Sequence, residues 1–390
     1  MRSGFVYSAL AMTPDYRTPA QLIEAHLQAR GWTQRVLALV LGTDQTAVSK
    51  IMNGTKPINA QLALTLQAVL GIPAEQLLHL QKEYELAKAK IEVRIDPGLP
   101  TRATLFGELP VTEMIKRGWL DGITDIRNVE KLEAALCKFF GVTSVDQIEI
   151  LPHAAKKTNV SGPATPAQIA WLYRVKRIAE DILVAKYSHN ALRETLNKFS
   201  LLLGGAEQVR RVPRMLMECG VRFVIVESLP SAKIDGVCFW LDEKSPVIGM
   251  TLRYDRIDNF WFVLRHECEH VLRGHGQSAA MLDWDLEGER AGTSSDVPEE
   301  ERIANVAAQE FCVPQSALNR FIARKAPFFA QRDILGFAST VKVHPGLVAG
   351  QLQHHTGRYD KFRNHLVKIR SAILPNAMVD GWGNVAPVGE

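Results

Sequence analysis

The string His266-Glu267-Cys268-Glu269-His270 constrains the fold of this 390-residue chain more than any other feature. It has the spacing H-E-x-x-H, and positions i and i+4 of an α-helix lie on one face about one turn apart. Two imidazoles so placed can bind one zinc ion, and Glu267 between them is then placed to act on a water molecule at the zinc. The motif therefore predicts a helix that carries a hydrolytic metal centre, with one Zn²⁺ per chain.

A catalytic zinc needs a third protein ligand and one position open to water. Three acids, Glu299, Glu300 and Glu301, begin the next predicted helix, 299–313, and Glu301 is the strongest candidate. Asn305 follows one turn later on the same face, where it could orient a ligand His. Glu300 is the alternative ligand. The same acids also favour a helix N-terminus electrostatically, whether or not they bind a metal.

His275 competes for the role of third ligand. In H-E-x-x-H-x-x-G-x-x-H sites the third His follows the second by six residues, but here Gly276 holds that position and Arg273 replaces the required glycine. We therefore expect His275 in a loop beside the site and not on the metal. Helical geometry directs Cys268 and Glu269 away from the two His side chains.

A second signal, in residues 33–54, predicts a helix-turn-helix. Thr33 and Asp44 are typical N-caps for its two helices, and Gly42 suits the turn between them. A plain helical bundle or a protein-binding domain would show the same periodicity. In the DNA-binding interpretation, the outer faces that contact DNA carry Gln34, Arg35, Gln45, Thr46, Ser49 and Lys50.

Composition and periodicity divide the chain into three expected domains. Residues 15–92 are helical throughout and predict a five-helix DNA-binding domain, and the Pro- and Gly-containing stretch 96–100 is a linker. Residues 101–215 hold several helical stretches. In the third domain, 216–390, the period changes, and three β-branched or aromatic runs precede the metal-binding helix, at 221–226, 236–241 and 246–253.

The expected fold class is therefore α+β and mostly α. It combines the helix-turn-helix domain, a helical middle region and a minimal zincin-like domain, in which a small antiparallel sheet accompanies the HExxH helix and the helix of the Glu ligand. We expect the strand within 246–253 to lie at the edge of a cleft, where it could hold an extended peptide through main-chain hydrogen bonds.

Targeting signals and cysteine usage limit where the protein acts. No run approaches the roughly 18 apolar residues of a membrane span, and the apolar stretch 5–12 is too short for a signal peptide. We therefore expect a cytoplasmic protein with no membrane partner. The five Cys form no C-x-x-C pair, which argues against a Cys-type zinc finger and against a disulfide framework.

Longer strings carry a resemblance to two families. Within residues 19–86, TPAQLIEAHLQARGWTQ, IMNGTKPI and LLHLQKEYEL resemble the Cro/repressor-type helix-turn-helix of HigA-like antitoxins. Within residues 221–355, DNFWFVLRHECEH, ERIANVAAQEFCVP and HPGLVAGQLQH resemble the ImmA/IrrE family of metallopeptidases. Two departures bear on cleft shape: Glu269 replaces the Gly that the family usually has before the second His, and Ala307-Ala308 replaces its usual Phe-Ala.

The resemblance implies that His266, His270 and Glu301 bind zinc, that Glu267 is the general base, and that the protein cleaves a repressor in trans to control a mobile element or stress genes. One hypothesis is thus a transcription regulator with a zinc endopeptidase domain, whose partners are an operator in double-stranded DNA and a protein substrate. The other is a HigA-like antitoxin or repressor, with a possible toxin partner, whose zinc domain only senses or binds. Helix-turn-helix modules commonly read paired half-sites, so we expect a homodimer.

Overall fold

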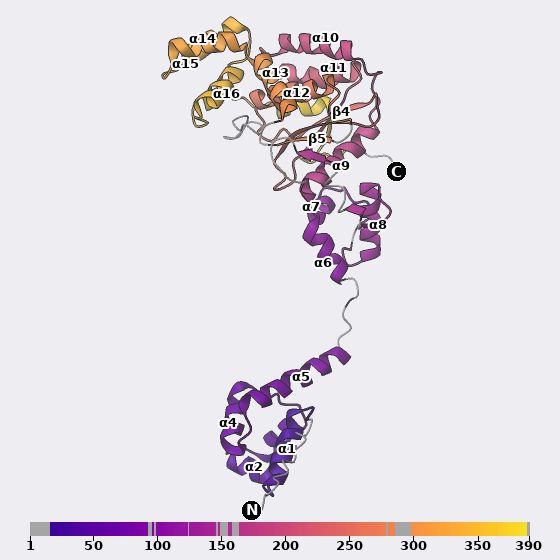
Figure 1. Cartoon of the computed structure of the whole chain (residues 1–390), viewed down its shortest axis with the longest axis vertical. Helices are drawn as coiled ribbons and strands as arrows, with labels where there is room; N and C mark the ends of the chain where they lie inside the picture. The colour runs from indigo at the N-terminus through magenta and orange to yellow at the C-terminus, as the bar shows by residue number, and fades with distance from the viewer. Residues whose placement is uncertain are drawn as a thin grey trace, which may run out of the picture. The chain divides into compact units, whose positions relative to one another are not determined.

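The chain folds into two compact units that divide after Pro97, within the expected linker 96–100 (Figure 1). Among the described residues, no helix is both long and apolar enough to cross a membrane. The computed structural model describes residues 16–92, 96, 99–123, 125–145, 147–148, 155–157, 164–277, 280–284 and 298–387.

The N-terminal unit contains the five predicted helices. Each of α1 to α4 begins at a polar N-cap whose side chain accepts a backbone N–H bond. Ile23, Val48 and Leu66 are fully buried where the helices meet. The left-handed Gly71, which needs no Cβ, ends the fourth helix. The bounds are α1 Pro19–Ala29, α2 Gln34–Val40, α3 Gln45–Met52, α4 Ala60–Leu70 and α5 Ala74–Glu92.

The C-terminal unit is built on a six-stranded sheet of order β1-β5-β3-β4-β2-β6, and the prediction of an antiparallel sheet was wrong. The β3–β4 hairpin and the β3–β5 pair are antiparallel, but β2 runs parallel to both β4 and β6, and β1 runs parallel to β5. The three predicted strands are present as β2, β3 and β4. The bounds are β1 Ala155–Lys157, β2 Arg222–Val226, β3 Ile234–Trp240, β4 Pro246–Met250, β5 Ala280–Trp284 and β6 Met378–Asp380.

Helices cover both faces of this sheet. Along β2, Phe223 and Ile225 pack into the core under α12 (Ile257–Leu272), whereas Val224 and Val226 pack into the core under α9 (Pro166–Glu180). Strands buried on both faces show no polar–apolar alternation, which is why the sequence did not reveal the parallel pairs. β4 pairs with a strand on each side, so it offers no free edge to a peptide, contrary to expectation.

The helices expected as a separate middle domain belong to this same compact unit. A buried carboxylate joins them to the C-terminal strand: Asp380 of β6 accepts hydrogen bonds from Arg174 of α9 and, at 2.9 Å, from the indole of Trp119. The remaining helices on this side of the sequence are α6 Leu99–Glu108, α7 Val111–Lys116, α8 Val129–Phe140, α10 His189–Phe199 and α11 Val212–Glu218.

Among the described residues between β5 and β6, four helices precede the short α17 (Arg370–Ile373) and complete the layer around α12. They are α13 Glu299–Cys312, α14 Gln315–Lys325, α15 Gln331–Val341 and α16 Pro345–Thr356. Two glycines let α16 lie close to the start of α12: a Cβ on Gly350 would stand 2.3 Å from a carboxylate oxygen of Asp258, and one on Gly346 would stand 2.7 Å from the side chain of Ile257. The side chains at the N-terminal end of α12 therefore pack directly against the backbone of α16.

Candidate metal centre and DNA-binding module

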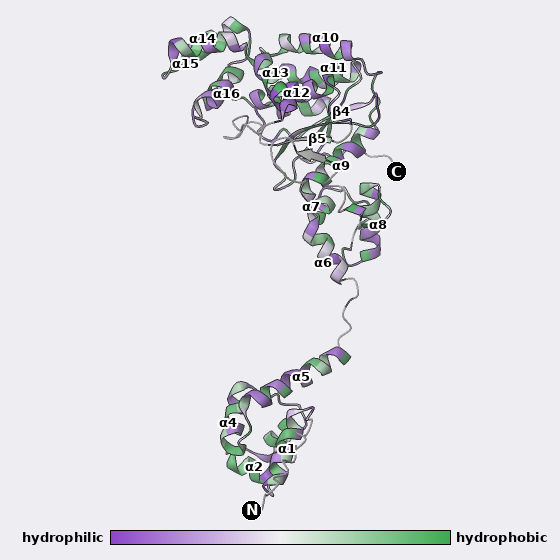
Figure 2. Ribbon diagram, in the orientation of Figure 1, coloured by the Kyte–Doolittle hydropathy of each residue, from purple (hydrophilic) through white to green (hydrophobic). Residues whose placement is uncertain are grey.

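The helix α12 carries its polar motif inside the molecule. It begins after the extended Arg256, and both of its sides are covered, so that most of its residues are buried. Figure 2 shows hydrophilic residues in α12 within the helical layer of the C-terminal unit. Buried polar side chains require polar partners or a bound ion. The buried motif therefore needs a chemical partner on the neighbouring helix.

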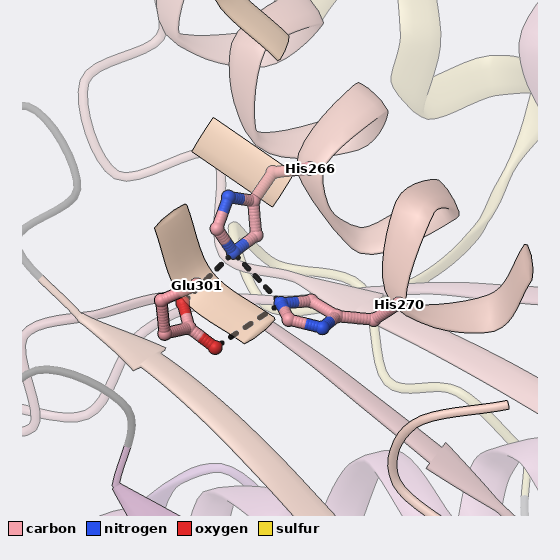
Figure 3. Close-up of side chains that lie close together, drawn as sticks. All are labelled: His266, His270 and Glu301. Atoms are coloured by element: carbon pink, nitrogen blue, oxygen red, sulfur yellow. Dashed lines mark hydrogen bonds and ion pairs between the residues drawn. The ribbon is translucent and has the colours of Figure 1, made fainter. Parts of the chain in front are cut away.

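That partner is α13, which packs against α12 and supplies Glu301 from its first turn. Figure 3 shows the two imidazoles and the carboxylate converging. The Nε2 atoms of His266 and His270 lie 3.0 Å apart, and Glu301 Oε2 and Oε1 lie 3.2 and 3.3 Å from them respectively. All three side chains are 0 % exposed. Among the described residues, these three form a group of His, Cys, Asp or Glu that could hold a metal ion.

The spacing of these atoms is close to that of the ligand atoms around a tetrahedral zinc ion. Ligand atoms about 2.05 Å from zinc in tetrahedral geometry stand about 3.3 Å from one another. The two Nε2 atoms are 3.0 Å apart, and each lies 3.2 or 3.3 Å from a different oxygen of Glu301. Both carboxylate oxygens of Glu301 are buried without a well-formed hydrogen bond to any described residue. Two ring nitrogens that face each other, with a carboxylate beside them, supply a donor set that suits a divalent cation.

Glu267 lies on the sheet side of α12 and is also fully buried. A Cβ placed on Gly236 of β3 would stand 2.0 Å from Glu267 Oε1 and 2.9 Å from Val263 Cγ1. The register between β3 and β5 is irregular at this glycine. The absence of a side chain at Gly236 therefore makes the space that the Glu267 carboxylate occupies, and no local pattern in the sequence indicates this contact.

His275 lies beside the centre, in the turn that follows α12. Its Nδ1 is 2.9 Å from Nδ1 of His270, the ring nitrogen that faces away from Glu301, and its backbone N–H donates to the carbonyl of His270. The indole of Trp240 donates to the carbonyl of His275 at 2.8 Å and fixes the turn. Burial lowers the pKa of His275, as does the nearby His270. His275 is thus placed to orient the ring of His270 and lies outside the group that could hold a metal ion.

Cys268 and Glu269 point away from the side chains of His266 and His270, as helical geometry predicts. Cys268 lies in the core, where burial raises the pKa of its thiol to about 12. Burial works to raise the pKa of Glu269, but hydrogen bonds from Arg265 and Arg273 at 2.8 and 2.7 Å outweigh it and hold that pKa below its ordinary value. Glu269, which stands where the ImmA/IrrE family usually has Gly, thus joins an ion-pair network along α12.

The acids that compete with Glu301 lie outside the cluster. Glu299 is exposed and pairs with Arg302, and Glu300 is half-buried. Asn305 is half-buried, and its Oδ1 has no hydrogen-bond partner among the described residues. The expected bond from Asn305 to a ligand His is therefore not part of the described structure, and His275 takes that position at His270.

The helix-turn-helix is formed by α2 and α3. Thr33 Oγ1 and Asp44 Oδ1 accept hydrogen bonds from the backbone at the start of their helices, at 3.3 and 2.7 Å, and Gly42 turns the chain with a φ of 64°. Among the six residues expected to contact DNA, four are exposed and two are half-buried. The exposed ones are Arg35, Gln45, Thr46 and Lys50, and the half-buried ones are Gln34 and Ser49.

Comparison with known proteins identifies this module. A family model of helix-turn-helix proteins matches residues 23–77, which span α2 and α3 and most of the N-terminal unit. The chain therefore carries the DNA-binding domain of a transcription regulator. No curated protein shows a significant match to the sequence.

Proposed function

We propose that this protein is a transcription regulator whose C-terminal unit is a zinc-dependent endopeptidase of the ImmA/IrrE type. The observation that carries the proposal is the buried convergence of His266, His270 and Glu301, with Glu267 retained between the two His residues. Three protein ligands leave one position for water, as in catalytic zinc sites. The proposed substrate is a repressor or another partner protein of the same regulatory system.

The chain's own residues would divide the work as follows. A zinc ion held by the three ligands would polarise a water molecule and lower its pKa toward neutrality. Glu267 would accept a proton from that water at a carboxylate oxygen and return one to the leaving amine nitrogen. His275 would keep the imidazole of His270 in the orientation that binds metal through Nε2.

Substitution of the proposed base tests this function. Glu267→Gln should retain zinc, because the side chain is not among the three ligands, and should prevent cleavage. The matched control is Glu299→Gln, which changes an exposed acid on α13. Proteins that accumulate with the Glu267→Gln variant in cells, identified by mass spectrometry, are the candidate substrates. If no protein accumulates, or if each candidate has the same half-life in wild-type and Glu267→Gln cells, the result would contradict turnover.

A second candidate function is a regulator whose zinc site senses or stabilises without turnover, as in the antitoxin hypothesis. Full burial of all three ligands favours it, because structural zinc sites are closed. It predicts that Glu267→Gln leaves regulation intact and that a toxin co-purifies. In either case Gln45→Ala with Lys50→Ala should weaken operator binding, measured at a fixed salt concentration. Unchanged affinity would show that α3 is not the recognition helix.

A further inference from the structure

A surface hollow of about 680 Å³ lies on the helices that follow the metal centre. It is bounded by the loop 326–330 between α14 and α15 and by residues 355–362 at the end of α16 and just after it. All of these residues fall within the described stretch 298–387. None of them belongs to the metal centre or to the helix-turn-helix, so the hollow is a separate feature of the unit.

Aromatic rings form the apolar part of the hollow. The ring centroid of Phe329 lies 6.1 Å from that of Phe362 and 5.9 Å from that of the buried Phe321. These two contacts fix the position of Phe329. Phe328 next to it is 83 % exposed, and no ring contact involves it among the described residues. Exposed aromatic side chains beside a concave apolar surface are typical of protein interaction sites.

The two charged residues that line the hollow, Arg358 and Lys361, are both basic, and they belong to a basic segment of the chain. Residues 315–370 contain ten Lys or Arg and two Asp or Glu, a balance of +8 in a chain whose net charge is +4. Both acids are already engaged: Asp333 pairs with Lys325 at 2.8 Å and Asp360 with Arg358 at 3.0 Å. This excess of positive charge would attract an acidic partner and raise its rate of association.

We propose that this hollow docks an acidic segment of another protein, which inserts one large apolar side chain against Phe328, Phe329 and Phe362. A single-stranded nucleic acid also combines negative charge with flat rings, but it is bound along a row of unopposed cations. Here the lining offers two cations, Arg358 and Lys361, which share the carboxylate of Asp360, and two neighbouring cations do not form such a row. The concave apolar surface suits one side chain better than a run of stacked bases.

A peptide-binding assay tests the site without depending on the proposed catalysis. The probe is a fluorescein-labelled 12-residue peptide, rich in Glu with one central Leu, titrated with the full-length Glu267→Gln protein so that it cannot be cut. Phe328→Ser should weaken binding about tenfold or more, whereas Phe328→Tyr should largely retain it. The matched control, Leu183→Ser, changes a side chain that is 89 % exposed outside the hollow and should have no effect.

Further measurements change the charge of the protein and the sequence of the peptide. Lys361→Glu should weaken binding and reduce its salt dependence, while Lys198→Glu on α10 should do neither. A peptide with Ser in place of Leu should bind at least tenfold more weakly. The proposal is overturned if the wild-type protein does not bind the peptide, or if Phe328→Ser and Leu183→Ser bind it equally well. It is also overturned if an oligonucleotide displaces the peptide and loses affinity with Phe328→Ser. A loss of self-association that accounts for the effect of Phe328→Ser would likewise overturn it.

Discussion

Replacing Gly236 by Ala should move the Glu267 carboxylate and leave the metal ligands in place. The new Cβ would stand 2.0 Å from Glu267 Oε1, and ordinary contact begins near 3.4 Å, so the carboxylate must retreat by about 1.4 Å (3.4 − 2.0). A misplacement of about 1 Å in a catalytic group can cost roughly 100-fold in rate, or about 2.7 kcal/mol. Overpacking against Val263 should lower the free energy of unfolding by about 1–3 kcal/mol.

Three measurements on one variant separate these effects. Zinc affinity, from competition with a chromophoric chelator, should stay within about threefold of wild type, because the three atoms nearest the Cβ belong to Glu267 and Val263 and not to a proposed ligand. Unfolding in denaturant should show the lost stability, and cleavage of an identified substrate should show the lost rate. The matched control is Gly336→Ala in α15, where a Cβ meets nothing within 4 Å and should stabilise the helix. Unchanged stability, or a tenfold loss of zinc affinity, would refute the argument.

Three other perturbations address the metal centre and the DNA-binding module. Glu301→Gln should reduce zinc affinity by more than about 100-fold. At a zinc concentration of about 1,000 times the wild-type Kd, the stabilisation by zinc should then fall from about 4 to below about 1.4 kcal/mol, whereas Glu299→Gln should leave the zinc-dependent shift in Tm unchanged. His275→Ala should weaken zinc binding about 10- to 100-fold through the orientation of His270; identical chelator competition curves would argue against that role. Asp44→Ala removes a helix cap and should lower the free energy of unfolding of the N-terminal unit by about 1 kcal/mol. The unfolding transition of that unit measures the loss, and an unchanged transition would contradict the prediction.

The parts of this structure that local spacing encodes could be predicted from the sequence. The i, i+4 spacing of His266 and His270 fixes them on one helical face, and an acid in the first turn of the next helix is a natural third ligand. The two caps Thr33 and Asp44 likewise fixed the start of each helix in the helix-turn-helix. In each case the information lies within a few residues of the motif.

The features that were missed depend on contacts between distant segments. Gly236 accommodates Glu267 only because β3 passes under α12, and no local pattern records that contact. His275 reaches His270 because the turn after α12 brings the chain back on itself. The parallel pairs of β2 follow from its place between β4 and a strand more than 150 residues later, 378–380. Because helices cover both faces of the sheet, its strands lack the polar–apolar alternation that is typical of antiparallel sheets with one face in water.

The division of ligands between two helices has a consequence for folding. His270 and Glu301 are 31 residues apart (301 − 270), and closing a flexible loop of that length costs about 3 kcal/mol of chain entropy. An ion bound to both helices would offset this cost and act as a removable cross-link between α12 and α13. Zinc supply would therefore also set how firmly α13 is held against α12, whereas α16 contacts α12 directly whether or not zinc is bound.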